Sequence, residues 1–157
     1  EIIILKPTDT DGGYGVAKLL NNFQIVSDYI QKHNKDAPFM VQEYLPEISD
    51  GERSIFFFNK KFKYAMLKKP KAAEFKCNED CVELLTRCSP TDKELETAQM
   101  AINELNSASV LERVDMTSSN KIMEMTLDCP GLYLVEAGIE KEIGKWFYEV
   151  VDAVKKK

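Results

Sequence analysis

The stretch Met123-Glu124-Met125-Thr126-Leu127-Asp128-Cys129-Pro130-Gly131, together with Arg113-Val114-Asp115 shortly before it, decides the fold and function that this sequence predicts. Asp115 and Glu124 each lie in a short run that predicts a β-strand, and Ser118-Ser119-Asn120 between them predicts a turn. In two neighbouring strands both carboxylates can point to one side of a sheet. A pair of carboxylates suits a hard divalent cation such as Mg²⁺, so this stretch predicts a metal site.

The composition is that of an ordinary globular protein. The chain has 157 residues, 44% of them hydrophobic and 30% charged, which is enough for one domain with a core of its own. No apolar run approaches the roughly 20 residues that span a bilayer, and no signal pattern opens the chain, so we expect no membrane partner and a cytoplasmic location. The net charge of −5 argues against non-specific binding to nucleic acid. Because the sequence begins at Glu1, inside an apolar strand, we expect the natural protein to extend further toward its N-terminus.

The cysteines do not form a recognisable metal motif. Cys77, Cys81, Cys88 and Cys129 contain no Cys-x-x-Cys pair, and His33 is the single histidine. A zinc site and a set of reduced, partly buried thiols both remain open, and the spacing favours the thiols.

The N-terminal segment combines a buried strand, a lysine and a glycine-rich loop. Residues 1–5 form a β-branched run typical of a strand buried on both faces, and Lys6 follows directly. In the loop over residues 8–16, Gly12, Gly13 and Gly15 can adopt positive φ and bring backbone N–H groups close to an anion. A plain turn beside a solvated lysine explains the same pattern, and the motif alone does not separate the two interpretations.

The remaining hydrophobic periodicity predicts an alternation of helices and strands. In chain order we expect a helix over 17–33, a strand over 39–45, a β-hairpin formed by 53–58 and 62–67, a loop over 72–89, a helix that begins near 89–94, strands over 110–116 and 121–125, and a last helix over 136–155.

A local basic cluster follows the hairpin. Lys68-Lys69-Pro70-Lys71 and Lys76 lie close together in an otherwise acidic chain. A solvated basic face accounts for lysines in general, but their concentration at a strand end also suits binding to a polyphosphate.

Seven short segments follow one another along the chain: Lys6-Pro7 with the glycine loop, Val41 to Glu47, Gly51-Glu52-Arg53-Ser54, Lys68-Lys69-Pro70, Glu74 to Asn78, Arg113-Val114-Asp115 and Met123-Glu124. In their order and spacing the chain resembles the ATP-grasp superfamily, in particular the glutathione synthetase-like carboxylate-amine ligases. This resemblance implies an α+β ATP-grasp fold of antiparallel sheets with flanking helices. It further implies one ATP-grasp domain fragment over 1–157, in which 1–45 belong to the lysine and glycine-loop subdomain and 46–157 form the C-terminal subdomain with the phosphate and metal residues. The family's N-terminal domain would then lie outside this chain.

The resemblance also implies roles for individual residues. The residues that would bind the nucleotide are Lys6, Gly12, Gly13 and Gly15 at the phosphates, Gln42, Glu43 and Leu45 at the adenine, and Glu52 at the ribose. The residues that would act on the transferred phosphoryl group are Lys68, Lys76 and Arg53. The implied metal ligands are Asp115, Glu124 and Thr126, and at the position of Thr126 the family carries asparagine or glutamate.

The implied activity is that of a ligase with ATP and Mg²⁺ as cofactors. Such an enzyme activates a small-molecule carboxylate as an acyl phosphate, which an amine or a thiol then attacks. A degenerate ATP-grasp module, which binds nucleotide for regulation or assembly without turnover, is the alternative. A domain that only interacts with other proteins is a third interpretation, and the sequence leaves homo-oligomer formation open.

Overall fold

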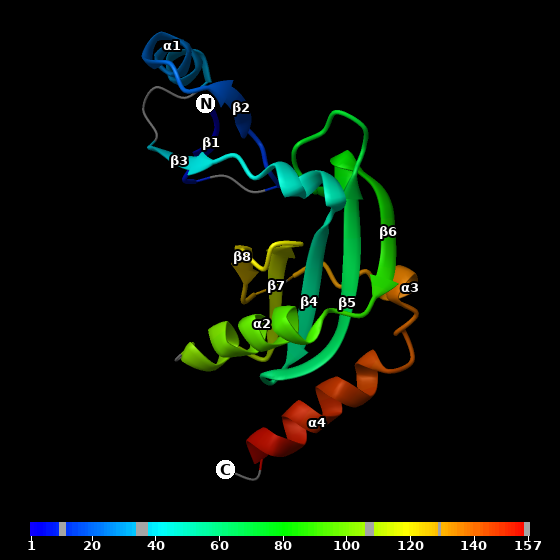
Figure 1. Cartoon of the computed structure of the whole chain (residues 1–157). Coiled ribbons are helices and arrows are strands. Elements are labelled where there is room, and N and C mark those ends of the chain that lie inside the picture. Colours follow the sequence, from blue (N-terminus) through cyan, green and yellow to red (C-terminus); the bar gives the residue numbers. More distant parts are fainter. Residues whose placement is uncertain (10–11, 34–37, 106–108, 129, 156–157) are drawn as a thin grey trace.

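The structure of the chain, a computed structural model, has two antiparallel sheets joined by the short 3₁₀ helix η1 (Pro46–Asp50) (Figure 1). The small sheet lies at the N-terminal end of the molecule, and the last helix lies at the opposite end. The structure describes residues 1–9, 12–33, 38–105, 109–128 and 130–155.

The small sheet has three strands in the order β2-β1-β3. Its elements are β1 (Ile2–Pro7), β2 (Ala17–Leu20), β3 (Phe39–Glu43) and the helix α1 (Phe23–His33). The central strand β1 is buried at Ile3, Ile4 and Leu5, as the β-branched run predicts. This sheet therefore holds Lys6, at the end of β1, on a rigid element.

The large sheet has five strands in the order β6-β5-β4-β7-β8, and every neighbouring pair is antiparallel. Its strands are β4 (Glu52–Phe58), β5 (Lys61–Pro70), β6 (Val82–Cys88), β7 (Leu111–Thr117) and β8 (Ile122–Thr126), and the 3₁₀ helix η2 (Glu79–Cys81) precedes β6. The predicted hairpin is confirmed. Asn59 and Lys60 have φ of 49° and 61°, which is the conformation that the tightest hairpin turns need.

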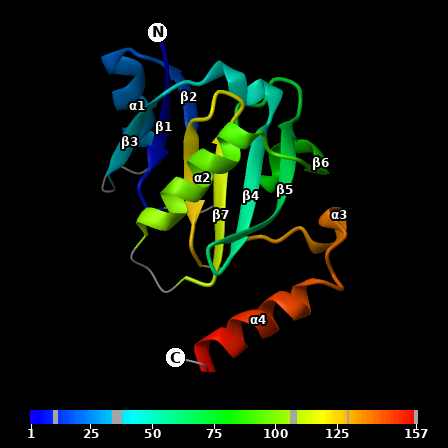
Figure 2. The same cartoon turned by 60° about the horizontal axis from the view of Figure 1, so that its bottom comes forward.

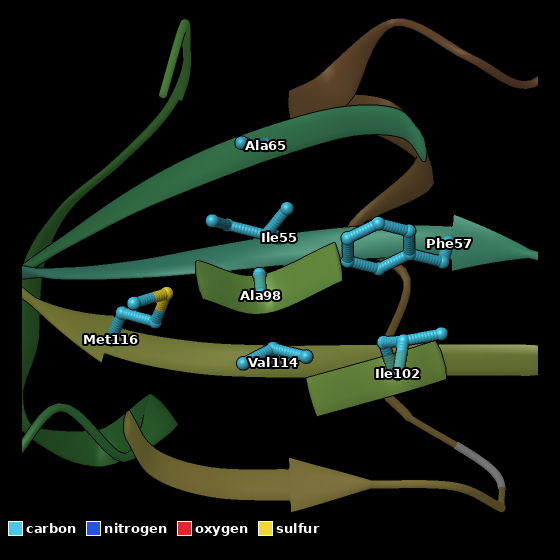
Figure 3. Close-up of a cluster of buried hydrophobic side chains, with 7 residues drawn as sticks. All are labelled: Ile55, Phe57, Ala65, Ala98, Ile102, Val114 and Met116. Carbon is cyan, nitrogen blue, oxygen red and sulfur yellow. The ribbon is translucent and has the colours of Figure 1, made fainter. Parts of the chain in front are cut away.

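Helix α2 (Asp92–Glu104) covers one face of the large sheet. Thr91 caps it in a reciprocal capping box with Glu94, which satisfies backbone N–H groups at the start of the helix. Under the helix lies a core from α2, β4, β5 and β7 (Figure 3), made by Ile55, Phe57, Ala65, Ala98, Ile102, Val114 and Met116. In β4, Ile55 and Phe57 point toward α2, so the even-numbered residues of this strand point to the opposite face of the sheet.

The opposite face is covered in part by the short helix α3 (Leu134–Ala137). Phe56, Tyr64 and Met66 pack there with Ala137 and Ile139. Helix α4 (Ile143–Lys155) extends along the end of the sheet that lies away from the small sheet (Figure 2). Neither α3 nor α4 covers the part of this face near η1, which faces the small sheet.

Three predicted elements were wrong in part. Residues 17–20 form β2, which pairs with β1, and the helix begins only after Asn22, whose side chain accepts hydrogen bonds from the backbone N–H groups of Gln24 and Ile25. Residues 82–88 form the edge strand β6 inside the predicted loop. The last helix is divided at Gly138, which has φ of 65°.

The fold class itself is confirmed, because the elements form antiparallel sheets with flanking helices. None of the helices in the described part of the chain is long and apolar enough to cross a membrane.

Candidate active site

A cavity of about 800 Å³ lies between the two sheets. The small sheet contributes Ile4, Lys6 and Gln42, and the large sheet contributes a row of charged residues. Because the segment around η1 connects the two sheets, it forms one end of this cavity through Leu45 and Ile48.

The strand register explains how the charged row forms. Across the sheet, Ser54 of β4 is the direct partner of Asp115 of β7, and Asp115 is the direct partner of Glu124 of β8. Directly paired residues point to the same face of a sheet. The prediction that Asp115 and Glu124 share one side is therefore confirmed. Two residues before Ser54 on β4, Glu52 pairs with Lys68 of β5.

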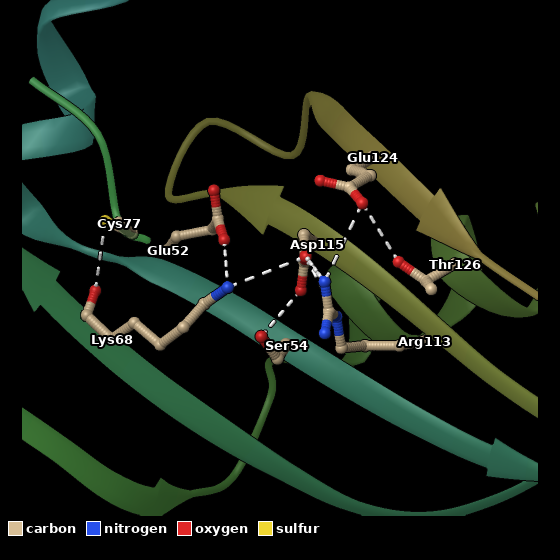
Figure 4. Close-up of polar contacts among 8 residues, drawn as sticks. All are labelled: Glu52, Ser54, Lys68, Cys77, Arg113, Asp115, Glu124 and Thr126. Atoms are coloured by element: carbon tan, nitrogen blue, oxygen red, sulfur yellow. Dashed lines mark hydrogen bonds and ion pairs between the residues drawn. The ribbon is translucent and has the colours of Figure 1, made fainter. Parts of the chain in front are cut away.

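Lys68 belongs to a charge cluster with Asp115 at its centre (Figure 4). Its Nζ forms an ion pair with Glu52 and lies 3.5 Å from Oδ2 of Asp115. Only 5% of Lys68 is exposed, and 2% of Asp115. Burial lowers the pKa of Lys68, but the negative charges of Asp115 and Glu52 outweigh burial, so its pKa is raised and the ammonium stays protonated at neutral pH.

Arg113 is a second cation in the cluster, and sequence reasoning missed it. Its Nη2 lies 2.8 Å from Oδ2 of Asp115 and 3.8 Å from Oε1 of Glu124, and its Nε donates a 3.0 Å hydrogen bond to Asp115. The signal was available, because Arg113 precedes Asp115 by two positions in a strand and so shares its face. The guanidinium thus joins the two carboxylates across β7 and β8.

The three predicted metal ligands lie side by side. Thr126 pairs with Arg113 in the sheet, and its hydroxyl donates a 3.0 Å hydrogen bond to Oε1 of Glu124. Asp115, Glu124 and Thr126 all line the large cavity. Within the described residues no group of three or more His, Cys, Asp or Glu side chains could hold a metal ion by itself.

The glycine loop reaches across the cavity to the segment before η2. Nζ of Lys76 donates a 3.1 Å hydrogen bond to the carbonyl oxygen of Gly13. Gly12, Gly13 and Gly15 have φ between 63° and 73°, so all three take the predicted left-handed conformation. A Cβ on Gly13 would collide with the side chain of Asn78, which would have to move, so this contact as well as the backbone conformation favours glycine here. Thr10 and Asp11 of this loop lie outside the described residues.

The side chains that β3 and the residues directly after it contribute to the cavity carry no charge. Gln42 lies among Ile4, Met40, Tyr44 and Leu45, all of which line the cavity. Nζ of Lys18 lies 3.8 Å from the centre of the Tyr44 ring and so packs against it as a cation–π contact.

The structure does not bring three of the predicted site residues to the cavity. Arg53 points to the α2 face, where its Nη1 lies 3.1 Å from Oε1 of Glu94. Glu43 is exposed at the end of β3 and alternates with Gln42, so it points to the other face of the small sheet. Gly15 packs against Pro7 instead, beside the hydroxyl of Tyr29.

A comparison with protein-family models matches residues 1–133 to the family described as prokaryotic glutathione synthetase, ATP-grasp domain. Among curated proteins, the glutathione synthetase of Buchnera aphidicola subsp. Schizaphis graminum (strain Sg) is 34% identical over 80 residues. The match covers 48% of this chain and 25% of that protein, so the chain spans only part of the relative.

Solved structures share the same fold. A crystal structure of the D-alanine–D-alanine ligase from Bacillus anthracis has a TM-score of 0.68 at 17% identity, over 99% of this chain and 56% of that one. The structure of the same ligase complexed with ATP has a TM-score of 0.57 at 18% identity, over 81% of this chain and 41% of that one.

Proposed function

This chain belongs to the family of prokaryotic glutathione synthetase ATP-grasp domains, and from that premise we propose that it forms the nucleotide-binding and catalytic part of an ATP- and Mg²⁺-dependent ligase. The ligase would activate a carboxylate as an acyl phosphate and pass the acyl group to an amine or a thiol. The observation that carries this proposal is the presence, in one cavity, of Lys6, Lys68 and Lys76 together with Asp115 and Glu124.

The cavity offers a separate environment to each part of ATP. The phosphates would lie between the glycine loop and the ammonium groups of Lys6 and Lys76, where positive charge and backbone N–H groups favour an anion. The adenine would lie against the uncharged side chains that β3 and the residues after it contribute, with its polar edge near Gln42 and Leu45. The relative in complex with ATP has the same fold, which supports a nucleotide in this cavity.

The residues present fit a Mg²⁺ ion that is held largely by phosphates. Mg²⁺ keeps several waters and is commonly bound by one or two carboxylates plus phosphate oxygens, so a third acidic ligand is not required. The carboxylates of Asp115 and Glu124 would hold it, with the hydroxyl of Thr126 as a neutral neighbour. When bound, the ion would neutralise charge on the phosphate oxygens.

The charge cluster supplies what the transfer step needs from the protein. An oxygen of the substrate carboxylate forms a bond to the γ-phosphorus as the bond between that phosphorus and the β,γ-bridging oxygen breaks, and ADP leaves. An amine or thiol then attacks the acyl carbon, loses a proton, and displaces phosphate. Lys68 and Arg113 stay protonated beside these groups, so they can stabilise negative charge that builds on the transferring oxygens.

A second candidate function is nucleotide binding without turnover, and Thr126 is the observation that favours it. Its single oxygen is neutral, and its hydroxyl already donates its hydrogen to Glu124, so it would be a weaker metal ligand than a carboxylate. A ligase that needs two well-held ions would be weakened at this position.

Two measurements test the proposal. Thermal unfolding should show stabilisation by Mg-ATP that ATP without Mg²⁺ does not reproduce, because a ligand at 100 times its Kd adds about 2.7 kcal/mol to the folded state. Glu124→Gln and Asp115→Asn should lose the Mg²⁺-dependent part, whereas Glu149→Gln on the exposed α4 surface should keep it.

Turnover decides between the two candidate functions. Release of ADP that requires a carboxylate supports the ligase, and binding of Mg-ATP without ADP release supports the module. A complete lack of stabilisation by Mg-ATP at saturating concentration overturns both.

A further inference from the structure

A second cavity of about 240 Å³ lies next to the first, beside the edge strand β6. It is lined by Lys68, Cys77, Val82, Glu83, Leu85 and Tyr133. Its volume is roughly eight times the ~30 Å³ that one water molecule occupies in the liquid, so it has room for a short organic substituent but not for a nucleotide.

The two cavities meet at shared walls. Lys68, Cys77 and Tyr133 line both of them, and no other residue does so among the described residues. Lys68 is also the residue that contacts Glu52 and Asp115 in the charge cluster. A molecule that placed one end beside Lys68 in the large cavity could therefore extend its other end into the small one.

The walls of the small cavity are mainly apolar. Val82, Leu85 and the ring of Tyr133 contribute hydrocarbon surface. Burial raises the pKa of Cys77 to about 12, so its thiol is neutral, and the thiol points its hydrogen at the carbonyl oxygen of Lys68, 3.5 Å away. The thiol is thus a packing group rather than a nucleophile.

The charges around the small cavity disfavour a second anion. The carboxylate of Glu83 lies at its wall, and the cation that it shares with the large cavity, Lys68, also contacts Glu52 and Asp115. A carboxylate at the far end of this cavity would lie near Glu83, and the repulsion between the two like charges makes its binding less favourable.

We propose that this second cavity receives the substituent of the carboxylate substrate, and that the substrate is a monocarboxylate with a short apolar substituent. The inference rests on the proposed ligase function for its orientation, because the carboxylate must face the phosphates and Lys68 in the large cavity. The substituent then lies against Val82, Leu85 and Tyr133, and Glu83 selects against dicarboxylates of the same length.

Pentanoate and glutarate test this selection, because both have five carbons and differ only at the distal end. Titration of the Mg-ADP-saturated protein, followed through the NMR signals of the Val82 and Leu85 methyl groups, should show binding of pentanoate at least about tenfold tighter than that of glutarate. Glu83→Gln should raise the affinity for glutarate at least about threefold and keep the affinity for pentanoate within about twofold of the parent. Glu83 is exposed, so this variant should fold normally.

Variants that fill the cavity provide the second test. Leu85→Phe and Val82→Phe should each lower the affinity for pentanoate at least about tenfold, since the larger phenylalanine side chains occupy the space that pentanoate needs. Leu84→Phe is the matched control, because Leu84 lies on the same strand, is 41% exposed and does not line the cavity, and it should stay within about twofold of the parent.

The outcomes separate this inference from the proposed function. Pentanoate binding that shifts Val82 and Leu85 and is lost in Leu85→Phe supports the inference. If Mg-ADP and Mg-ATP bind but pentanoate does not shift these methyl groups, or if glutarate binds as tightly, the inference is wrong and the proposed function stands. If neither nucleotide binds, the proposed function fails, and the inference that rests on it fails too.

Discussion

The hydroxyl of Ser54 donates a 2.6 Å hydrogen bond to Oδ1 of Asp115, between strands β4 and β7, and both residues are buried. This bond fixes the carboxylate that we propose as a Mg²⁺ ligand. It joins positions 61 residues apart in the sequence, so the geometry of the site depends on the pairing of these two strands.

Ser54→Ala should lower the free energy of unfolding by about 1 to 3 kcal/mol, because it removes a hydrogen bond to a buried charged acceptor. Urea unfolding measures the change. Ser49→Ala removes an exposed hydroxyl that bonds to the carbonyl of Pro46, and it should cost no more than about 0.5 kcal/mol. Equal losses in the two variants would contradict a special role for the Ser54 bond.

Glu112→Gln should stabilise the chain at neutral pH. Glu112 is 1% exposed, its Oε2 has no hydrogen-bond partner among the described residues, and burial raises its pKa against the opposing effect of the Lys60 backbone N–H. A group whose folded pKa is raised contributes stability below its ordinary pKa of 4.5 and loses it as the pH rises through the folded value.

The advantage of Glu112→Gln should therefore grow from pH 4.5 toward pH 7 and reach on the order of 1 kcal/mol, as measured by denaturant unfolding at several pH values. Glu96→Gln on the exposed side of α2 is the control, because it removes a carboxylate that is not buried. If the parent chain instead becomes more stable relative to the Glu112→Gln variant as the pH rises, the direction of the pKa shift is wrong.

Gly13→Ala should destabilise the closed glycine loop by more than Gly12→Ala does. Both glycines have positive φ, which costs an L-residue about 1 to 2 kcal/mol, but only at Gly13 does the added Cβ meet another side chain. Asn78→Ala should then recover the excess loss of Gly13→Ala in a double-mutant cycle followed by urea unfolding. If the two substitutions are simply additive, the contact between Gly13 and Asn78 does not determine the loop.

Arg53→Met should leave the affinity for Mg-ATP within about twofold of the parent, because the side chain lies on the α2 face. The same change should lower the free energy of unfolding by about 1 to 3 kcal/mol, since it leaves the buried Glu94 without its ion pair. Because Arg53 is partly exposed, this loss should be smaller than that for a fully buried ion pair. Calorimetric titration and urea unfolding measure the two effects. Lys68→Met is the comparison, and it should lower the affinity for Mg-ATP at least about tenfold.

The sequence predicts the pairs that are close in the chain better than those that are far apart. Asp115 and Glu124 lie on strands joined by one turn, so the sequence indicates that they can share a face, but the irregular register between Asp115 and Met116 means that the period of a strand alone does not determine their pairing. The same period separates Arg53 from Glu52, and applying it would have placed Arg53 with the core. A motif position alone carries no information on which face of a sheet a side chain occupies.

Other features depend on contacts that no local pattern encodes. Residues 17–20 have the composition of a helix and form β2 because β1 offers a partner. Strand β6 is an edge strand whose side chains are mostly exposed, so it lacks the alternation that marks a strand. The ion pair of Lys68 with Glu52 and Asp115 joins three strands, and the resemblance gave only the separate residues.

The pairing of β4 with β7 has a consequence for the order in which the molecule folds. Between these strands the chain forms β5, β6 and α2, so β4 gains its second neighbour only after a long loop has closed. Contacts of this kind are slow to form compared with a local hairpin. We therefore expect the hairpin of β4 and β5 to form early with Lys68 beside Glu52, and the charge cluster to be completed late, when β7 brings Arg113 and Asp115 to them.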